Sequence, residues 1–288
     1  MPELPEVQTI VSQLKTKVLK RTFVDCWTDT PKLLKGISFD IFKKKISKKR
    51  IKNIWRRGKN ILFELSDGLF MLIHQKMTGH LMLGKWEKKN GFWIPKTDGP
   101  FAKDKANKYI RFIFFLDNGQ MLAFSDLRKF GKIRLGDSAD FSELAKMGPE
   151  PLDQNFKFSD FLKAISKKKN GRIKQVLMDQ DVIAGIGNIY SDEILWRAKV
   201  QPFKKISGLN DKEKKDIFKF IKSVLKDAVD LKGESFSDYR DLFGEKGNFD
   251  KIRKVYKRQG ELCSKCKTEI IKKKIGSRST CFCPNCQK

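Results

Sequence analysis

The chain has 288 residues, with 62 Lys and Arg against 34 Asp and Glu, for a formal net charge of +28. Its longest apolar runs, such as residues 112–116, are strand-sized, so a membrane-spanning helix is excluded. The positive excess favours a polyanionic partner, with nucleic acid first, although a general lysine bias would produce part of it. Lysines stand where a signal peptide would need apolar residues, so we expect a cytoplasmic protein.

Two types of pattern follow one another in the first half of the chain. Apolar residues at helical spacing predict a helix over residues 5–19, with Pro5 suited to its first turn and one face buried. From about Phe39 to Leu135 the pattern changes to short segments rich in aromatic and β-branched residues, separated by SDG and DNG turns. We therefore predict an antiparallel β-sandwich with a buried N-terminal helix.

The second half is predicted to be helical. Paired prolines at 147–153 mark a linker, and a Gly- and Ser-rich loop is expected over 232–248. Helices are predicted over Ser159–Lys168, Arg172–Asp179, Asn188–Ala198 and Asp211–Leu231. The fold class is thus α+β and multidomain. The predicted boundaries are a sandwich domain over 1–135, a linker over 136–150, a helical domain over 151–244 and a cysteine-rich module over 245–288.

The cysteine-rich module has the spacing of a metal site. Cys263-x2-Cys266 and Cys283-x2-Cys286 are two knuckles sixteen residues apart, which can place four thiolates tetrahedrally on one Zn²⁺ from a β-hairpin. Four protein ligands close the site, so the zinc is expected to be structural. Cys281 is expected to be a spectator that could compete as a ligand. Lysines and Arg278 between the knuckles suit contact with phosphate.

A helix–turn–helix element precedes that module, over residues 172–198. Asn188 is expected at the N-cap of its second helix, after the flexible GIG at 185–187. Glycines let the backbone approach a ligand closely, and a helix N-terminus offers free N–H groups to an anion. A plain tight turn between packed helices explains the same residues about equally well.

The start of the chain carries a possible nucleophile. Removal of Met1 would free the secondary amine of Pro2, whose pKa of roughly 8 leaves part of it neutral at pH 7. Attack on an aldehyde-level carbon would give an iminium that cannot lose its charge as an N–H proton. The adduct would therefore act as an electron sink for elimination, and Glu3 could transfer protons beside it.

Six motifs in this order resemble the bacterial formamidopyrimidine-DNA glycosylase family over essentially the whole chain: MPELPEV, RRGK, MTGHL, DLRKFG, GIGNIY and the terminal four-cysteine ribbon. The resemblance implies a bifunctional base-excision repair enzyme. It would remove oxidised purines such as 8-oxoguanine and formamidopyrimidines, and then cleave the abasic strand by β,δ-elimination. It also implies a helix-two-turn-helix DNA-binding domain, damaged double-stranded DNA as the partner, no small-molecule cofactor, a monomer, and association with the nucleoid through DNA.

The resemblance also assigns roles to residues of this chain. Pro2 matches the nucleophile, Glu3 the general acid, and Lys59 a lysine beside the lesion phosphate that assists proton transfer. The residues that fill the gap left by a flipped-out base are matched by Met77, Arg128 and Phe130. Phosphate contacts are matched by Lys174 and Asn188 of the helical domain and by Arg278 of the zinc hairpin, which is counted with the catalytic residues. Supporting carboxylates are matched by Glu6 and by Glu193, a helix acid near the active site.

Two departures from the family pattern concern base preference. Gln75-Lys76 stands where the family commonly has Leu-Gly, which adds charge beside Met77. Lys232 replaces a usual glycine in KGESFSDY, which resembles the loop that closes over the everted base.

Two alternatives stay open at this point. The sister enzymes that prefer oxidised pyrimidines resemble PEGPE rather than PELPE at the start, so Leu4 speaks against them. A non-catalytic zinc-ribbon DNA-binding or damage-sensing protein would keep the charge, the ribbon and the helix–turn element. Such a binder would not need Pro2, Glu3 and Lys59 together.

The charge excess predicts steeply salt-dependent DNA binding. Each phosphate that the protein neutralises should lower the slope of log K against log salt by about 0.9, because condensed counterions are released. Titration of a labelled duplex between low and physiological salt measures this slope. A flat dependence would mean that the lysines only keep the protein solvated.

Overall fold

The computed structural model describes residues 1–96, 99–235 and 239–288. The chain divides into two compact units, which are described separately. Unit 1 contains Met1–Ala145 and Lys232–Asn248, and unit 2 contains Lys146–Leu231 and Phe249–Lys288. Among the described residues, no helix is both long and apolar enough to cross a membrane.

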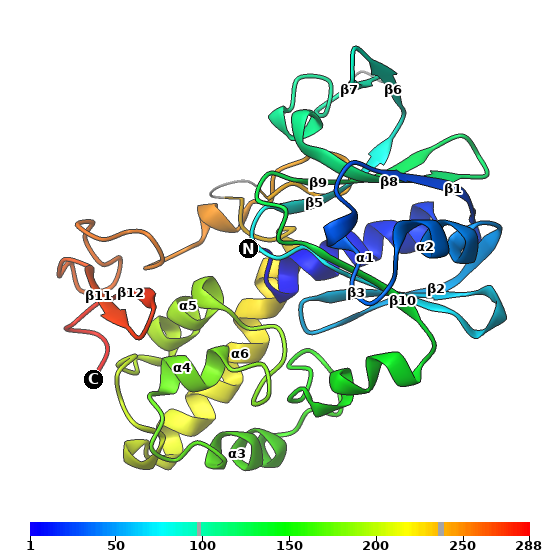
Figure 1. Cartoon of the computed structure of the whole chain (residues 1–288). Coiled ribbons are helices and arrows are strands. Elements are labelled where there is room, and N and C mark those ends of the chain that lie inside the picture. Colours follow the sequence, from blue (N-terminus) through cyan, green and yellow to red (C-terminus); the bar gives the residue numbers. More distant parts are fainter. Residues whose placement is uncertain (97–98, 236–238) are drawn as a thin grey trace. The chain divides into compact units, whose positions relative to one another are not determined.

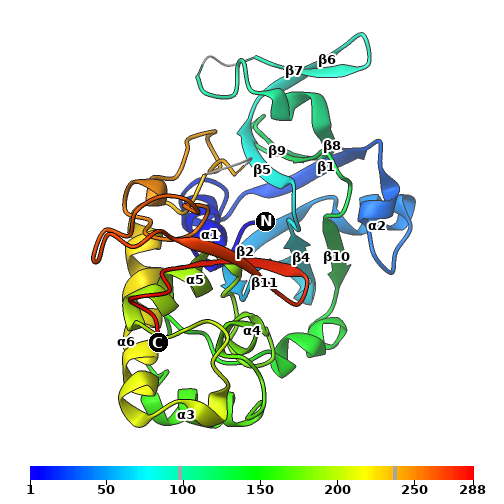
Figure 2. The ribbon, with the colours of Figure 1, turned by 90° about the vertical axis from the view of Figure 1, so that its left-hand side faces the viewer.

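Unit 1 is an antiparallel sandwich built around one helix (Figures 1 and 2). Its eight-stranded sheet has the order β10-β4-β3-β2-β1-β8-β9-β5. Its strands are β1 (Thr22–Thr28), β2 (Lys49–Arg57), β3 (Asn60–Leu65), β4 (Phe70–His74), β5 (Gly79–Gly84), β8 (Ile110–Leu116), β9 (Met121–Asp126) and β10 (Lys132–Gly136). A separate hairpin is formed by β6 (Trp86–Lys89) and β7 (Phe92–Pro95).

The sheet folds into two layers because β1 and β2 pair over only two residue pairs, Thr22 with Arg50 and Phe23 with Lys49. Helix α1 (Leu4–Lys17) lies between the layers in Figure 1. Its apolar face joins residues of both layers in one core, which is also rich in phenylalanine rings. The predicted sandwich with a buried N-terminal helix is confirmed.

One element of unit 1 was predicted wrongly. Helix α2 (Phe39–Ile46) lies in a region that the sequence analysis assigned to β segments. Phe42 and Ile46, four residues apart, are its only buried residues, and the Phe42 ring packs edge-on against Phe112 at 5.5 Å. Eight residues are barely two turns, which is too short for helical periodicity to be recognised among its four apolar residues, so the tertiary contact decides the conformation.

Unit 2 contains the four predicted helices and the cysteine hairpin. The helices are α3 (Phe158–Ser166), α4 (Ile173–Met178), α5 (Asn188–Ala198) and α6 (Asp211–Asp230), and the hairpin strands are β11 (Ile271–Ile275) and β12 (Arg278–Phe282). Trp196 of α5 belongs to the same buried cluster as Cys263, Cys281 and Cys283. The hairpin is therefore packed on the helices rather than forming a compact unit of its own.

The contacts also group residues 232–248 differently from the predicted boundaries, which placed most of this segment with the helices. Tyr239 and Leu242 are part of the sandwich core, and the backbone N–H of Leu83 in β5 donates to the carbonyl of Leu242 at 3.0 Å. The segment leaves the end of α6 and returns to unit 2 only at Phe249. Its composition indicates a loop but contains no signal for the sheet on which it packs.

Candidate active site and nucleic-acid interface

The candidate catalytic residues Pro2 and Glu3 lie at the start of α1. Both are buried, with Glu3 only 2% exposed, whereas Met1 is 42% exposed. The carboxylate of Glu6 accepts a hydrogen bond from the backbone N–H of Glu3 at 2.7 Å, which fixes the first turn of the helix. While Met1 is attached, the Pro2 nitrogen is an amide nitrogen with no basic lone pair. Any nucleophilic role therefore requires its removal.

Lys59 lies in the turn between β2 and β3 and is largely buried. The turn is connected to α1 by Arg56, whose guanidinium donates to the Gly58 carbonyl at 2.9 Å and to the Gln8 side chain at 3.0 Å. Lys59 and the N-terminal residues are thus held by the same helix.

Met77, Arg128 and Phe130 are brought together, although about fifty residues separate the two segments in the sequence. A guanidinium nitrogen of Arg128 lies 3.2 Å from the Met77 sulfur, and its Cζ lies 4.6 Å from the centre of the Phe130 ring. Met77 and Phe130 are about half exposed and lie against the same guanidinium, so together they form an exposed apolar patch. An exposed apolar cluster around one cation suits insertion between stacked bases.

The segment 232–248 is attached to α1 at two levels. The second carboxylate oxygen of Glu6 accepts from the N–H of Glu234 at 2.8 Å, and a Cβ on Gly233 would lie 2.6 Å from that oxygen. Gln13, two turns further on, donates to the Asp241 carboxylate at 2.6 Å and accepts from the Leu242 N–H at 2.9 Å. Residues 236–238 of the predicted base-closing loop lie outside the described residues.

Lys232, one of the two departures from the family pattern, lies within the part of the chain that the structure describes. Its backbone has a φ of 60°, the left-handed region that a glycine would adopt without strain. Its ammonium lies 3.9 Å from the carboxylate of Asp241.

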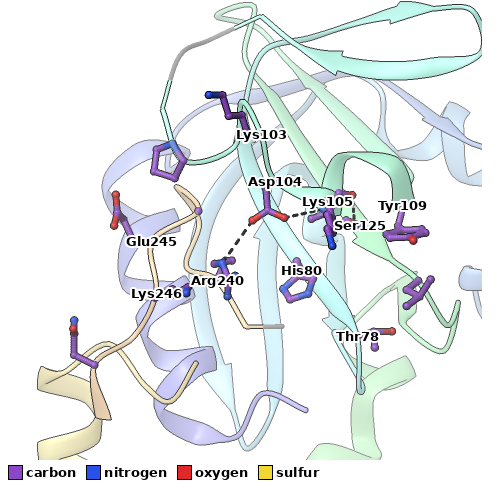
Figure 3. Close-up of a pocket in the computed structure, with 15 residues that line it drawn as sticks. Thr78, His80, Lys103, Asp104, Lys105, Tyr109, Ser125, Arg240, Glu245 and Lys246 are labelled. Atoms are coloured by element: carbon purple, nitrogen blue, oxygen red, sulfur yellow. Dashed lines mark hydrogen bonds and ion pairs between the residues drawn. The ribbon is translucent and has the colours of Figure 1, made fainter. Parts of the chain in front are cut away.

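A cavity of about 910 Å³ opens on unit 1 next to the Met77 turn (Figure 3). Thr78 and His80 line it from one strand end, and Arg240 and Lys246 line it from the segment 232–248. The Asp104 carboxylate connects two parts of its wall. It accepts a hydrogen bond from the Ala106 N–H at 2.8 Å and lies 3.6 Å from the Arg240 guanidinium. Its lining combines cations, Tyr109 and small polar groups, which suits an anionic or aromatic ligand.

His74 and Lys76 lie at the end of β4, beside Lys59 and Lys132. Nδ1 of His74 accepts from the Lys76 N–H at 2.9 Å, which leaves the proton of the neutral ring on Nε2. Burial first, and then the positive charges of Lys76, Lys59 and Lys132, lower the pKa of His74 to about 3. Burial and Lys132 also lower the pKa of Lys76. The Lys76 departure therefore adds to a concentrated positive field.

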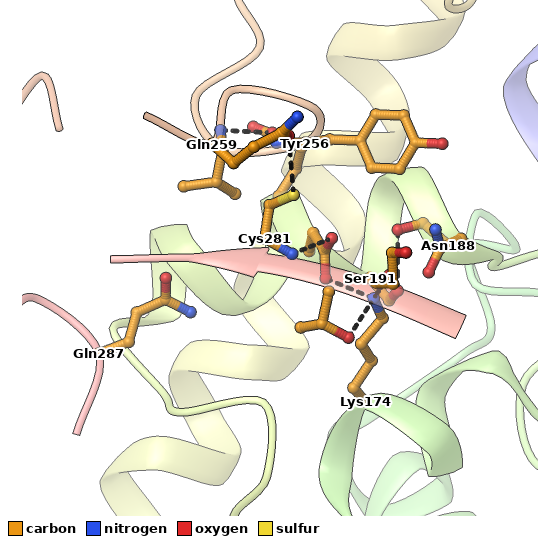
Figure 4. Close-up of polar contacts among 12 residues, drawn as sticks. Lys174, Asn188, Ser191, Tyr256, Gln259, Cys281 and Gln287 are labelled. Atoms are coloured by element: carbon orange, nitrogen blue, oxygen red, sulfur yellow. Dashed lines mark hydrogen bonds and ion pairs between the residues drawn. The ribbon is translucent and has the colours of Figure 1, made fainter. Parts of the chain in front are cut away.

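In unit 2, Lys174 is placed differently from its predicted role. Its side chain is 1% exposed and its ammonium lies 2.7 Å from the buried carboxylate of Asp192. It also donates to the Ser279 carbonyl at 3.0 Å and to the Thr280 hydroxyl at 2.8 Å (Figure 4). Burial raises the pKa of Asp192 to about 7 although Lys174 opposes the shift. Lys174 thus joins α4 to β12 and does not present its charge to a phosphate.

Asn188 is the first residue of α5, and Gly187 rather than Asn188 occupies the N-cap, which corrects the prediction by one position. The preceding turn is held by Gln180, which accepts from the Gly185 N–H at 2.9 Å and donates to the carbonyls of Met178 and Ile186. The helix N-terminus therefore has a fixed approach, and Asn188 remains a candidate phosphate contact there.

Glu193 is buried and holds the chain that leads to the zinc module. Its carboxylate accepts from the backbone N–H groups of Lys254, Val255 and Tyr256, each at 2.8 Å. Burial raises the pKa of Glu193, and these three hydrogen bonds act against the shift. The contacts give this acid a structural role within unit 2.

The four predicted zinc ligands form one cluster. The sulfurs of Cys263, Cys266, Cys283 and Cys286 all lie within 4.8 Å of one another, with Cys266 and Cys283 at 3.4 Å. Tetrahedral thiolates about 2.3 Å from zinc would be about 3.8 Å apart, so the cluster fits one structural Zn²⁺. Cys281 is outside it: its N–H donates to Asp192 at 3.0 Å, and its buried thiol has a raised pKa.

Arg278 is exposed at the first position of β12, next to the hairpin turn. Lys272, Lys273 and Lys274 are exposed on the facing strand. A cavity of about 240 Å³ is lined by Arg278 and Ser277 of the hairpin and by Gln175 of α4. The hairpin thus presents four cations to solvent, as phosphate contact requires.

Sequence reasoning missed Asp192, Gln180 and Gln13, which position the predicted residues. Asp192 lies next to Glu193 in a helix that is buried on nearly every side, a property that its mixed polar and apolar sequence NIYSDEILWRA does not show. The amide side chains of Gln13 and Gln180 have no local signature, because their partners are distant backbone groups or lie in an irregular turn.

A sandwich, a helix–turn element with a buried core and a four-thiolate hairpin define a class of zinc-containing, helix-two-turn-helix nucleic-acid-binding proteins. The sequence comparisons narrow this class. The profile for the formamidopyrimidine-DNA glycosylase N-terminal domain matches residues 1–133, that for its H2TH domain matches 147–240, and the zinc finger found in FPG and IleRS matches 260–288. The chain belongs to the formamidopyrimidine-DNA glycosylase family.

Relatives and solved structures agree over the full length. The formamidopyrimidine-DNA glycosylases of Herpetosiphon aurantiacus and Heliobacterium modesticaldum are 35% and 36% identical, with 100% of both chains covered. A Lactococcus lactis FPG mutant bound to Fapy-dG DNA has a TM-score of 0.86 at 30% identity, with both chains fully covered. MutM bound to DNA containing carbocyclic 8-oxo-G has a TM-score of 0.85 at 30% identity, again with full coverage.

The buried Lys174–Asp192 pair predicts a large loss of stability when it is broken. Lys174→Met should lower the free energy of unfolding by about 3 kcal/mol, because it leaves the Asp192 carboxylate buried without its cation. Urea unfolding of the full chain measures the loss. Lys212→Met is the matched control, since the Lys212–Asp216 pair on α6 is exposed and should contribute nothing measurable. Equal stability of the two variants would contradict the assignment.

The lowered pKa of His74 predicts a pH dependence of stability. Because its folded pKa of about 3 lies below the usual 6.5, the unfolded chain binds more protons between these values. The stability that neutral His74 contributes is present above pH 6.5 and is lost as the pH falls toward 3. Unfolding of the wild type should therefore take up about one proton more than unfolding of His74→Gln between pH 3 and pH 6.5. Urea midpoints measured against pH give the difference, and superimposable profiles would contradict it.

Proposed function

We propose that the protein is a base-excision DNA repair enzyme that removes oxidised purines, including 8-oxoguanine and formamidopyrimidines, and then cleaves the abasic strand. The observation that carries this proposal is the combination within unit 1 of a buried Pro2–Glu3 start with an exposed Met77–Arg128–Phe130 cluster. Relatives of known structure were solved with DNA that contains Fapy-dG, 8-oxo-G or an abasic site, which supports the same lesion class here.

The chemistry that we propose begins with Pro2. Its secondary amine, freed of Met1, attacks C1′ of the damaged nucleotide, and the N-glycosyl bond breaks as the base leaves with a proton. The bound amine loses its N–H proton and the C1′–O4′ bond then breaks, with O4′ taking up a proton from Glu3, so that the sugar ring opens to an iminium. This iminium withdraws electrons from the sugar, so that loss of a C2′ proton expels the 3′ phosphate. Loss of a C4′ proton in a second elimination then expels the 5′ phosphate. Glu3 supplies and removes protons at the sugar. Capping by Glu6 keeps Glu3 in a defined place for these transfers.

The remaining charged residues bind and orient the DNA. We propose that Lys59, Asn188 and Arg278 contact phosphates near the lesion, with Lys59 also assisting proton transfer. We assign Lys174 to hold the zinc hairpin that carries Arg278, on account of its burial and its bonds to Ser279 and Thr280. Glu6 and Glu193 support the active site and the zinc module through the backbone groups that they bind.

The zinc contributes no step of this reaction. Four cysteines fill its coordination sphere, so the metal stabilises the hairpin and leaves no open position for substrate. We further propose that the protein acts as a monomer in the cytoplasm on double-stranded DNA, without a small-molecule cofactor.

Trapping with borohydride tests the nucleophile. Untagged protein incubated with a duplex carrying 8-oxoguanine opposite cytosine should give a covalent complex on reduction, because the reductant converts the iminium to a stable amine. Protein that retains Met1 or carries an N-terminal tag should give none. Peptide mass spectrometry should locate the adduct on Pro2. Equal trapping by tagged protein, or an adduct on a lysine, would overturn the assignment.

Two further substrates separate the alternative functions. Excision of thymine glycol at a higher rate than 8-oxoguanine would move the protein to the enzymes for oxidised pyrimidines. Failure to nick a preformed abasic site, with DNA affinity retained, would indicate a non-catalytic damage sensor.

A further inference from the structure

The residues of the exposed cluster come from two connections that cross between the layers of the sandwich. Residues 75–78 lead from β4 to β5, and residues 127–131 lead from β9 to β10. In the sheet order, β10 and β4 lie at one edge and β9 and β5 at the other. Each connection therefore passes from one edge of the sheet to the other, and no strand pairing joins the connections to each other.

A buried carboxylate joins the two connections. Asp126, the last residue of β9, is fully buried. One of its oxygens accepts from the Thr78 hydroxyl at 2.6 Å and from the Arg128 N–H at 3.2 Å, and the other accepts from the Gly131 N–H at 2.8 Å. Thr78 directly follows Met77, so the carboxylate lies beneath both parts of the exposed cluster.

The Thr78 hydroxyl is both a hydrogen-bond donor and an acceptor. It donates to Asp126 and also accepts from the Arg128 N–H at 3.1 Å. The residue after Met77 is thereby bonded both to the backbone of Arg128 and to the acid that organises the second loop. A Cβ on Gly131 would lie 2.5 Å from the Phe124 ring and 3.2 Å from the Asp126 carboxylate, so the close fit depends on glycine.

The upper parts of the loops are exposed. Met77, Leu127 and Phe130 are about half exposed, and Lys76 and Lys129 have left-handed φ values of 54° and 57°. Exposed side chains on tight turns lose conformational entropy when they are ordered in DNA. Fixing the bases of both loops beforehand reduces that cost, because the two segments then move as one body.

We propose that Thr78 and Asp126 are positioning residues that hold Met77 and Arg128 at one spacing, so that the two loops enter the DNA together. The inference rests on the proposed function. Because Asp126 is fully buried, it acts only through its hydrogen bonds and does not touch DNA. Filling the gap of a flipped-out base is required in a duplex, whereas an abasic site in a single strand leaves no stacked gap to fill.

The test compares two substrates with untagged Thr78→Val, which keeps the volume of the side chain and removes its hydroxyl. Single-turnover excision of 8-oxoguanine from a duplex should fall about tenfold, as expected when a buried hydrogen-bonding group loses its partner. Nicking of an abasic site in a single strand should stay within about twofold of wild type, since no insertion is needed. Thr78→Ser should restore duplex excision because it keeps the hydroxyl.

Two further variants keep the test decisive. Thr28→Val is the matched control. Like Thr78, Thr28 both donates and accepts through its hydroxyl, to the Arg111 carbonyl at 2.6 Å and from the Thr30 N–H at 2.9 Å, but it lies in β1. It should leave the ratio of the two activities unchanged. Asp126→Asn replaces one acceptor oxygen by an N–H2 group, so it should lower duplex excision at least as much as Thr78→Val, again with single-strand nicking retained.

A fluorescent probe reports insertion itself. With 2-aminopurine next to the orphaned base, the fluorescence rise on mixing with wild type should be slowed in Thr78→Val and restored in Thr78→Ser. The inference is overturned if Thr78→Val excises from duplex at the wild-type rate, if Thr78→Ser fails to rescue, or if both substrates lose activity together. Inactivity of the wild type on both substrates would instead overturn the proposed function.

Discussion

The structure depends on the burial of α1 between the two layers of the sandwich. Its apolar face belongs to the main core, and its first turn holds Pro2 and Glu3 in place through the carboxylate of Glu6. Because the same carboxylate binds Glu234, and Gln13 binds Asp241 and Leu242, one helix orients both the candidate nucleophile and the segment 232–248. A terminus that would otherwise fray is thereby held in place, as the proposed covalent chemistry requires.

Buried charge has a second organising role. Asp126, Glu193 and Asp192 are almost inaccessible, and each carboxylate binds backbone N–H groups of a segment that is irregular or distant in sequence. Such acids are costly to bury, so they favour one arrangement in which all of their partners are present. The exposed lysines have the opposite role. Their summed positive charge suits a polyanion.

Much of this architecture could be predicted from local patterns. Helices α1, α3, α4, α5 and α6 lie within two residues of their predicted bounds because each carries an apolar stripe. The four cysteines could be assigned because their spacing is itself the signal. Helix α2 was missed because its eight residues are too few for helical periodicity to be recognised. The direct phosphate contact predicted for Lys174 is not supported because its ammonium is buried against Asp192, and a partner eighteen residues away leaves no local signal in the sequence.

The sequence by itself determined the class of each main element, the zinc ligands and the order of motifs that places the chain in its family. Periodicity and ligand spacing are local properties, so they can be recognised without knowing which elements pack against each other. Only the tertiary structure decided that Lys174 is inside, that residues 232–248 pack on the sandwich, and that Met77, Arg128 and Phe130 meet. Whether a charged side chain is exposed, and whether two loops meet, depends on residues that are distant in the sequence. These residues come into contact only when the core forms.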